Sequence, residues 1–408
     1  MTLHAQKQTD RYHFETLQIV LKIAERCNIN CSYCYYFNQD IDSSIGRPAL
    51  ISLETAEAIA QYVARGVSEV GIKRVIVSFH GGEPLLLKPS RFDEVCHVLR
   101  KHIEPVARLG LSVQTNGTIL NEQWLEVFKA HEINVGVSID GGRVANDRFR
   151  LDHRGRSTFD KVEGNLVTLL AQSGDGDIAK PGTISVVDPR NDYQHESLRG
   201  IGISTLSFLL PDRTHDVKFE PHEPLEAYGH ALKKIADVWF EEDDPEVQVR
   251  QISCFFENFQ KAAGSQNMLS SDKKLRPFKI MIIQSNGEVS LNDSYMPASD
   301  WYASQKKLSV FDSTLQEFLN QEVFDRLDTA EMDLAPECQS CRWVGICRGG
   351  DLENRYSRVD GFKNPSVYCS ALKMFYETIE NHLITGGFPK TQLEERLAEA
   401  ARNIAVTK

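Results

Sequence analysis

Seven of the nine cysteines in this chain of 408 residues fall into two short groups, and this clustering constrains the fold more than any other feature. The groups are Cys27, Cys31 and Cys34, and then Cys338, Cys341, Cys347 and Cys369. In a chain of this size, clustered cysteines indicate metal ligands or redox groups before disulfides. The sequence therefore predicts two metal centres.

The rest of the composition is that of a globular protein. A hydrophobic content of 41% over 408 residues is enough for one large catalytic domain and a smaller one. The net charge of -11 argues against general binding to DNA or RNA phosphates. The N-terminus is polar without a signal-peptide core, and the apolar run Ile203–Leu210 is far shorter than the roughly 20 residues that span a bilayer. We therefore expect a cytoplasmic protein with neither a membrane nor a nucleic-acid partner.

Between residues 17 and 222, strand-like runs alternate with amphipathic helix patterns, which is typical of a parallel α/β sheet. The expected strands are Leu17–Ile23, Val75–Phe79, Leu111–Gln114, Val135–Ile139, Thr183–Val187 and Leu206–Leu210. Six such units predict an α/β fold with a partial (β/α)6 TIM-like barrel. In parallel α/β folds the chemistry gathers at the C-terminal ends of strands, and the first cysteine group directly follows the first strand.

The second half of the chain is predicted to be organised differently. A helix over Leu225–Trp239 leads into a region where the periodicity becomes irregular and Cys, Gly, Asn and Asp accumulate. This composition favours a small domain organised by metal more than by a hydrophobic core. The predicted division is an N-terminal tail at 1–16, the barrel at 17–222, a bridging helical region at 223–277, the metal-organised domain at 278–370 and C-terminal helices at 371–408.

The first cysteine group places three thiolates in a short loop. Three protein ligands on a [4Fe-4S] cluster leave one iron open, and the amino and carboxylate groups of S-adenosylmethionine (SAM) can chelate that iron. An electron from the reduced cluster can then break the sulfonium C–S bond. The alternative is a zinc or purely structural site, although structural zinc more often has four protein ligands.

The spacing of this group, C-x3-C-x-aromatic-C with Tyr33 at the aromatic position, resembles the signature of the radical SAM superfamily. The next strand ends in His80-Gly81-Gly82-Glu83-Pro84, which resembles the GGEP element of that superfamily. Glycines at a strand end let backbone groups approach a ligand closely, and Glu83 can accept a hydrogen bond from the SAM ammonium. The resemblance implies that Tyr33 and residues 81–84 belong to the SAM site.

Two further strand ends resemble SAM contacts of the same superfamily. Gln114 and Asn116 close one strand and Ser138 closes the next, at positions that resemble contacts to the ribose and carboxylate of SAM. Arg150 resembles an arginine that pairs with the SAM carboxylate. The alternative for each position is an ordinary βα turn that uses Asn, Gly and Asp for their turn geometry.

The second cysteine group supplies four thiolates, which can close a metal site completely. That suits an electron-transfer cluster or, equally, a structural zinc ion. The pattern resembles the SPASM extension of radical SAM enzymes that modify peptides and proteins. The resemblance implies that residues 278–370 form a SPASM-like domain in which Cys338, Cys341, Cys347 and Cys369 hold an auxiliary [4Fe-4S] cluster.

The chain departs from a full SPASM domain at the positions that would hold a second auxiliary cluster. Asn292 and Asp351 stand where that pattern has cysteines, and Cys254 is the one candidate survivor. We therefore expect at least one auxiliary cluster and leave the second open. Cys96, on a predicted helix with Phe92, is interpreted as a buried core thiol.

Asp293 follows the substituted position Asn292. In related sulfatase-maturing enzymes an aspartate at this place takes a substrate proton, so the resemblance makes Asp293 the candidate general base. The alternative is a solvated Asp in an Asn-Asp-Ser turn.

The segments Gly349–Ser357 and Asn364–Cys369 resemble maturases that form cyclophanes in ribosomal peptides. The resemblance implies abstraction of a hydrogen atom from the Cβ of a peptide side chain. The carbon radical then attacks an aromatic ring on a nearby residue and forms a C–C cross-link. The resemblance also implies a ribosomally synthesised precursor peptide and an electron donor such as flavodoxin or ferredoxin. Because the cluster loop begins within the first 30 residues, we expect no leader-binding domain ahead of the barrel.

Several alternatives stay open at this point. Ether or thioether cross-linking is close in chemistry, and sulfatase-type oxidation of Cys or Ser to formylglycine is a further enzymatic reading. The missing auxiliary cysteines argue against the last of these. A zinc-binding structural or sensor protein with two closed sites is the non-enzymatic alternative, and a brown protein with about eight irons would exclude it.

Overall fold

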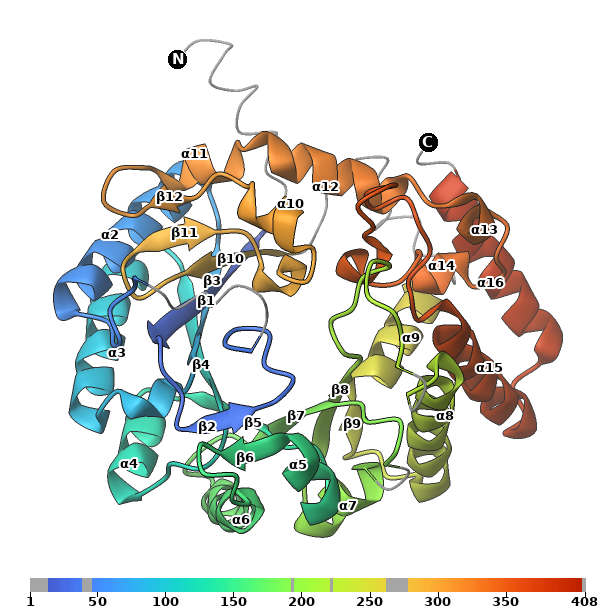
Figure 1. Ribbon diagram of the computed structural model, residues 1–408, viewed down its shortest axis with the longest axis horizontal. Coiled ribbons are helices and arrows are strands. Elements are labelled where there is room, and N and C mark those ends of the chain that lie inside the picture. Colours follow the sequence, from blue (N-terminus) through green and yellow to red (C-terminus); the bar gives the residue numbers. More distant parts are fainter. Residues whose placement is uncertain (1–13, 39–45, 192–193, 221–222, 262–277, 406–408) are drawn as a thin grey trace. The chain divides into compact units, whose positions relative to one another are not determined.

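The computed structural model describes residues 14–38, 46–191, 194–220, 223–261 and 278–405 (Figure 1). The chain divides into two compact units, which are described separately: unit 1 is residues 1–139, 146–181 and 274–324, and unit 2 is residues 140–145, 182–273 and 325–408. Parts of four predicted regions lie outside the described residues, namely 1–13 of the tail, 39–45, 192–193 and 221–222 of the barrel, 262–277 of the bridging region and 406–408 of the C-terminal helices. No described helix combines the length and the apolar character needed to cross a bilayer.

Unit 1 is built on parallel strands whose alternating residues are buried. In spatial order these strands are β10 (Phe278–Ile283), β1 (Thr16–Ala24), β3 (Arg74–Gly81), β4 (Arg108–Thr115) and β5 (Asn134–Ser138). Val75, Val77 and Phe79 of β3 are buried because successive side chains of a strand point to opposite faces. The expected α/β fold with a parallel sheet is confirmed.

The strand β10 extends this sheet from a distant part of the chain. It pairs in parallel with β1, so that Leu17 lies opposite Lys279 and Leu21 opposite Ile283. Two short antiparallel strands follow it, β11 (Glu288–Ser290) and β12 (Leu308–Ser309). The sequence pattern did not predict that residues 278–283 would continue the sheet of the N-terminal strands.

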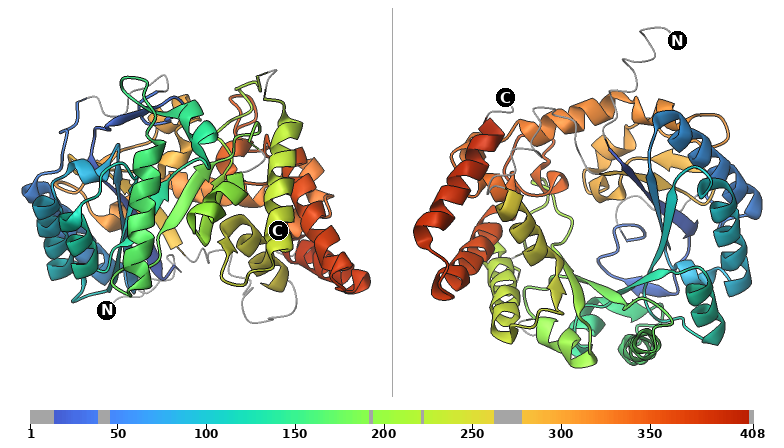
Figure 2. Two further views of the ribbon diagram at one scale, coloured as in Figure 1. Left: turned by 90° about the horizontal axis from the view of Figure 1, so that it is seen from below. Right: turned by 180° about the vertical axis from the view of Figure 1, so that it is seen from behind.

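Helices cover one side of the unit 1 strands, as Figures 1 and 2 show. They are α2 (Leu53–Val70), α3 (Pro89–Ile103) and α4 (Glu122–Ala130), with α6 (Phe159–Gly174) further along the chain. Ser52 caps α2 by accepting from the backbone N–H of Thr55, and Gly71 ends it in the left-handed conformation. Each fully buried aliphatic side chain of such a helix, Ile59 for example, contributes about 1.5–3 kcal/mol.

Short elements position the functional loops of unit 1. The antiparallel pair β2 (Ile29–Cys31) and β6 (Arg150–Asp152) fixes the first cysteine loop. The other short elements are η1 (Pro84–Leu86), η2 (Asp293–Tyr295), α10 (Ser299–Ala303) and α11 (Leu315–Leu319). Two helices contain residues of both units, α5 (Arg143–Phe149) and α12 (Glu322–Met332).

Unit 2 contains three parallel strands and most of the C-terminal helices. The strands are β7 (Gly182–Val186), β8 (Thr205–Leu209) and β9 (Gln248–Val249). The helices are α7 (Gln194–Ile201), α8 (Leu225–Glu242), α9 (Arg250–Lys261), α13 (Pro336–Gln339), α14 (Val344–Cys347), η3 (Leu352–Arg355), α15 (Cys369–Thr385) and α16 (Lys390–Ala405). α15 packs along α8, and α14 packs on α16 and α9. The six expected strands and the helix expected from Leu225 are all present.

Candidate functional site

The first cysteine group lies in unit 1 directly after β1. Cys31 ends β2, and the backbone N–H of Cys34 donates to the carbonyl of Cys31 at 2.9 Å, which closes a tight turn. Burial, with the Glu83 carboxylate and the Cys31 thiol adding to it, raises the pKa of Cys27 to about 12. The free thiol is therefore protonated at neutral pH, and binding of iron must displace that proton. Three neighbouring thiols of this kind fit a [4Fe-4S] cluster with one open iron.

The two glycines after β3 pack against the chain that leads into Cys27. The N–H of Gly82 donates to the carbonyl of Ala24, and the N–H of Glu83 donates to that of Arg26, each at 2.7 Å. A Cβ on Gly82 would lie 2.2 Å from the Arg26 oxygen, so only glycine fits. In the structure these glycines admit the backbone of the cysteine loop, and their contact with SAM stays a prediction.

Glu83 is fully buried and joins the ends of β3 and β4. Its Oε1 accepts from the Leu85 N–H at 2.9 Å and the Thr115 hydroxyl at 2.7 Å, and its Oε2 accepts from the Asn116 N–H at 2.7 Å. Burial raises the pKa of this carboxyl, although these hydrogen bonds oppose the effect. The Asn116 amide in turn lies 3.6 Å from the Cys27 sulfur and donates to Asn28 at 2.8 Å. Glu83 and Asn116 therefore meet the cysteine loop.

The other predicted SAM contacts form two pairs in unit 1. The Gln114 amide donates to the Ser138 hydroxyl at 2.8 Å, which joins the ends of β4 and β5. The buried Arg150 donates from Nη1 to the Tyr33 hydroxyl at 2.8 Å, and it faces Cys31 in the β2–β6 pair. The pair of Arg150 and Tyr33 therefore lies at the cysteine loop, and the pair of Gln114 and Ser138 lies at the ends of β4 and β5.

Asp293 is buried in a compact cluster of polar side chains, not solvated in a turn. Its Oδ2 lies 2.7 Å from the Lys22 ammonium and accepts from the Tyr35 hydroxyl at 2.9 Å. Lys22 is fully buried in β1 and lies 3.3 Å from Nδ1 of His80, its register partner in β3. Because Tyr35 directly follows Cys34, this cluster lies at the end of the cysteine loop.

The charges of this cluster are set by its own members. Burial and the Lys22 ammonium lower the pKa of His80 to about 4, so the imidazole is neutral at neutral pH. Burial alone raises the pKa of Asp293, but the Lys22 ammonium and the hydrogen bond from Tyr35 hold it below the ordinary carboxyl value. Asp293 is thus a carboxylate at neutral pH, available to accept a proton from a stronger acid.

Substituting Lys22 should change the pH dependence of any reaction that uses this carboxylate. In a Lys22→Met variant, burial is no longer opposed by the ammonium, so the pKa of Asp293 rises and the acid limb of the pH–rate profile moves to higher pH. Product formation measured from pH 5.5 to 8.5 would detect the move. Lys73→Met, which removes an exposed charge just before β3, is the matched control. An acid limb at the same pH in wild type and Lys22→Met would contradict this electrostatic coupling.

The second cysteine group lies in unit 2, where short helices present its thiols. Cys338 lies on α13, Cys347 ends α14 and Cys369 begins α15, while the N–H of Cys341 donates to the Cys338 carbonyl at 3.1 Å. Burial raises the pKa of Cys347 to about 12, and the Cys369 and Cys338 thiols add to the rise. The four thiols are therefore close enough to act on one another.

The spacing of these four sulfur atoms bears on the metal they can hold. Among the described residues, no three of these thiols place their sulfur atoms within 4.8 Å of one another. Tetrahedral zinc with bonds of about 2.3 Å would hold them about 3.8 Å apart. A four-iron cluster puts a cage of iron and sulfide between its thiolates and needs a wider spacing. Four thiolates can serve as ligands for either metal.

A buried cation accompanies this group. Arg355 is 1% exposed, and its guanidinium donates to the backbone carbonyls of Ala330, Asp333 and Asn364 at 2.9–3.1 Å. Arg355 lowers the pKa of Cys338, although burial dominates and the net shift is upward. A guanidinium held by neutral carbonyls offsets the negative charge that four thiolates would bring.

The polar cluster around Asp293 was only partly predicted from the sequence. The sequence analysis gave no role to Lys22, Tyr35 or His80, although a feature of the sequence points to each of them. Lys22 interrupts the apolar strand Thr16–Ala24, and the other two flank recognised motifs. Cys96 is fully buried, as expected, whereas Cys254 is exposed on α9.

Comparison with known proteins agrees with this site. Residues 21–173 match the radical SAM superfamily. A cysteine-type anaerobic sulfatase-maturating enzyme of Clostridium novyi is 24% identical over 382 residues, which cover 89% of this chain and 95% of that relative.

Two solved structures share the fold. The structure described as native anSMEcpe with bound AdoMet has a TM-score of 0.74 and 22% identity, and the match covers 91% of this chain and 98% of that one. Streptococcus suis SuiB bound to the precursor peptide SuiA has a TM-score of 0.60 and 16% identity, covering 90% and 78%. The family match over residues 21–173, the shared fold and the cysteine loop agree: this chain contains a radical SAM domain and is an enzyme that uses a [4Fe-4S] cluster and SAM.

Proposed function

We propose that this enzyme is a peptide maturase that oxidises a side chain of a ribosomally synthesised peptide and joins its Cβ to an aromatic ring. The observation that carries this proposal is the Asp293 cluster beside the first cysteine loop. A radical formed on a peptide must lose one electron and one proton to give a closed-shell product. A buried carboxylate next to the radical-forming centre is suited to take that proton.

The residues of unit 1 have distinct roles in this proposal. When bound to Cys27, Cys31 and Cys34, a reduced [4Fe-4S] cluster supplies the electron that cleaves SAM to methionine and a 5′-deoxyadenosyl radical. Gln114, Asn116, Ser138 and Arg150, together with Tyr33 and Gly81–Pro84, border the place where SAM would bind. Buried side chains around them exclude water, which protects a radical from side reactions.

Asp293 completes the oxidation as the proton acceptor. Once a ring that carries the new C–C bond has lost an electron, its ring C–H is strongly acidic. A carboxylate with a lowered pKa is then a sufficient base, and Lys22 keeps it ionised. The cross-linked peptide has lost two hydrogens in all: one as an atom to the deoxyadenosyl radical and one as a proton to Asp293.

The four thiols of unit 2 are proposed to hold the group that accepts the electron lost by the substrate. We propose that Cys338, Cys341, Cys347 and Cys369 hold an auxiliary [4Fe-4S] cluster, which would supply an electron acceptor for the oxidation. The buried Arg355 beside them, whose positive charge offsets that of the thiolates, supports this assignment. A small reductant such as flavodoxin or ferredoxin would supply the electron consumed in SAM cleavage.

Formylglycine formation is the second candidate function. It is favoured by the similarity to the cysteine-type anaerobic sulfatase-maturating enzyme of Clostridium novyi. Both reactions remove a hydrogen, an electron and a proton from a side chain, so the same base would serve either. They differ in product, because formylglycine is an aldehyde and a cross-link is not.

Mass spectrometry of two peptides tests the choice. The reconstituted enzyme is incubated anaerobically with SAM, reductant and either the precursor peptide encoded beside its gene or a cysteine-containing sulfatase peptide. Cross-linking predicts a precursor lighter by two hydrogens that does not react with a hydrazide and whose fragmentation is suppressed between the joined residues. A hydrazide-reactive sulfatase peptide with an unmodified precursor would favour formylglycine instead. Deoxyadenosine, measured in parallel, reports SAM cleavage independently of the peptide.

A further inference from the structure

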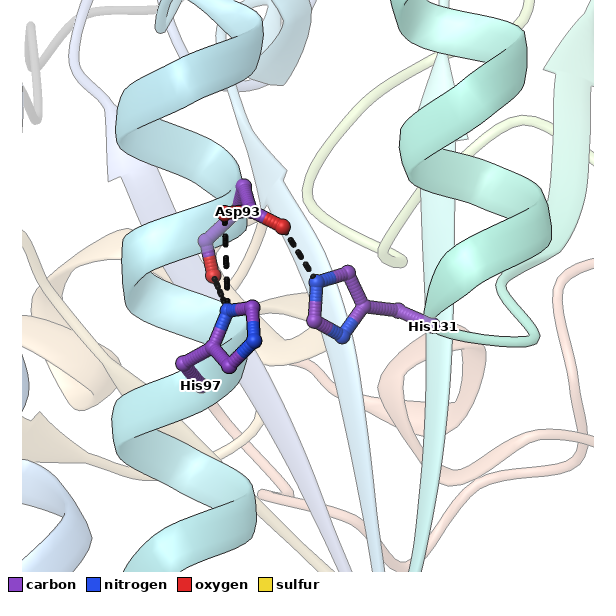
Figure 3. Close-up of side chains that lie close together, drawn as sticks. All are labelled: Asp93, His97 and His131. Atoms are coloured by element: carbon purple, nitrogen blue, oxygen red, sulfur yellow. Dashed lines mark hydrogen bonds and ion pairs between the residues drawn. The ribbon is translucent and has the colours of Figure 1, made fainter.

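A third group of metal-ligating side chains lies in unit 1, apart from both cysteine groups in sequence. Asp93 and His97 are one helical turn apart on α3, and His131 is the residue that ends α4. Side chains four residues apart lie on the same face of a helix. One ligand atom from each of the three residues lies within 4.8 Å of the others, and Figure 3 shows the three side chains pointing toward one another.

The carboxylate lies between the two imidazoles. Oδ1 of Asp93 is 2.7 Å from Nε2 of His131, and its Oδ2 is 3.5 Å from Nδ1 of His97 (Figure 3). The two rings are nearly perpendicular, with centroids 4.8 Å apart. Two imidazoles and one carboxylate that converge from two helices are a donor set for first-row divalent metals.

The hydrogen-bonding capacity of the His131 ring is only partly used by the described residues. It is 3% exposed, and its Nδ1 is buried without a hydrogen-bond partner in the part of the chain that the structure describes. Nε2 must carry the proton if it donates to the carboxylate, and Nδ1 is then a bare lone pair. Burial of the ring keeps Nε2 directed at Asp93, which is the arrangement that an ion bound between the two side chains requires.

The open side of the group faces solvent. The His97 side chain is 69% exposed and that of Asp93 is 39% exposed, so an ion can enter without opening the fold. Zinc bonds of about 2.0–2.2 Å to nitrogen and oxygen hold the donor atoms about 3.4 Å apart. Rotation of the exposed His97 and Asp93 side chains can adjust these separations, so that the 2.7 Å contact between Asp93 and His131 widens while His131 stays fixed by burial.

We propose that Asp93, His97 and His131 bind one Zn²⁺ ion, with water in the remaining coordination position. The ion would join α3, which follows β3, to α4, which follows β4. These two strands carry Glu83 and Asn116 at their ends. The site would thus brace the two helices behind the strand ends that border the cysteine loop.

Zinc binding to the reconstituted holoenzyme tests this site, because the clusters then occupy the seven grouped cysteines. The protein is dialysed against Zn²⁺ alone and its bound zinc is counted by elemental analysis. We expect one zinc per chain in addition to the iron. Zinc K-edge X-ray absorption should show a shell of nitrogen and oxygen without the sulfur shell at about 2.3 Å that cysteine ligation gives.

Variants of the exposed ligand make the test specific to this group. His97→Ala should weaken zinc binding at least tenfold without unfolding the protein, because the side chain is largely exposed. His102→Ala, on the same helix but paired with Glu57 at 2.5 Å, should leave zinc binding unchanged. Absence of bound zinc, a sulfur shell in the absorption spectrum, or equal zinc affinity in wild type and His97→Ala would each overturn the proposal.

Discussion

Replacing Asp293 with asparagine should lower formation of modified peptide by about 10²- to 10⁴-fold, the usual contribution of a general base. The amide keeps the size of the side chain but cannot take the substrate proton. SAM cleavage precedes that proton transfer, so deoxyadenosine should still form. Separate quantification of deoxyadenosine and modified peptide in the same reaction measures both effects.

The ratio of modified peptide to deoxyadenosine separates a loss of proton transfer from a loss of SAM cleavage. Asp312→Asn, a substitution of an exposed aspartate in unit 1, should leave both products at the wild-type level. Loss of deoxyadenosine in Asp293→Asn would mean that the residue supports SAM cleavage or the fold of the site. Undiminished peptide modification would remove Asp293 from the proposed mechanism.

Replacing Gly82 with alanine should abolish binding of the first cluster. The new methyl group would lie 2.2 Å from the carbonyl oxygen and 2.4 Å from the carbonyl carbon of Arg26, and backbone atoms cannot rotate away. The chain leading into Cys27 must then move. We expect a loss of about four irons per chain and of SAM cleavage, while the irons that we propose for the second cysteine group remain.

A glycine elsewhere in the sheet supplies the control for this substitution. A Cβ on Gly110 of β4 would meet only Ile76, at 3.9 Å, so Gly110→Ala should keep both iron and activity. Iron and sulfide analysis of both variants after identical reconstitution makes the comparison. Full iron content in Gly82→Ala would show that the loop tolerates the displacement.

Much of the fold could be predicted because its signals are local. The six strands are short apolar runs bounded by turn residues, and period-2 burial in β3 follows directly from its sequence. The cysteine groups were visible for the same reason, since each lies within a few tens of residues. A family resemblance assigned Arg150 and Tyr33 to the SAM site, and the structure shows that they are hydrogen-bonded to each other.

What could not be predicted depends on contacts between distant parts of the chain. Lys22 and Asp293 are 271 positions apart, and nothing local to either residue indicates the other. The role of Gly82 depends on how closely the Arg26 carbonyl approaches, which no periodicity records. The group on α3 and α4 was missed because His131 lies in a different helix from Asp93 and His97.

The parallel pairing of β1 with β10 has a consequence for how the chain is made. During synthesis, residues 16–21 emerge long before their pairing partners, residues 278–283. One edge of β1 therefore has no partner until more than 250 further residues have been synthesised. At about 5–20 residues per second this interval is roughly ten seconds to a minute. An unpaired edge that lasts this long is open to pairing with other strands, so a nascent or truncated chain ending before β10 should aggregate more readily than the full chain.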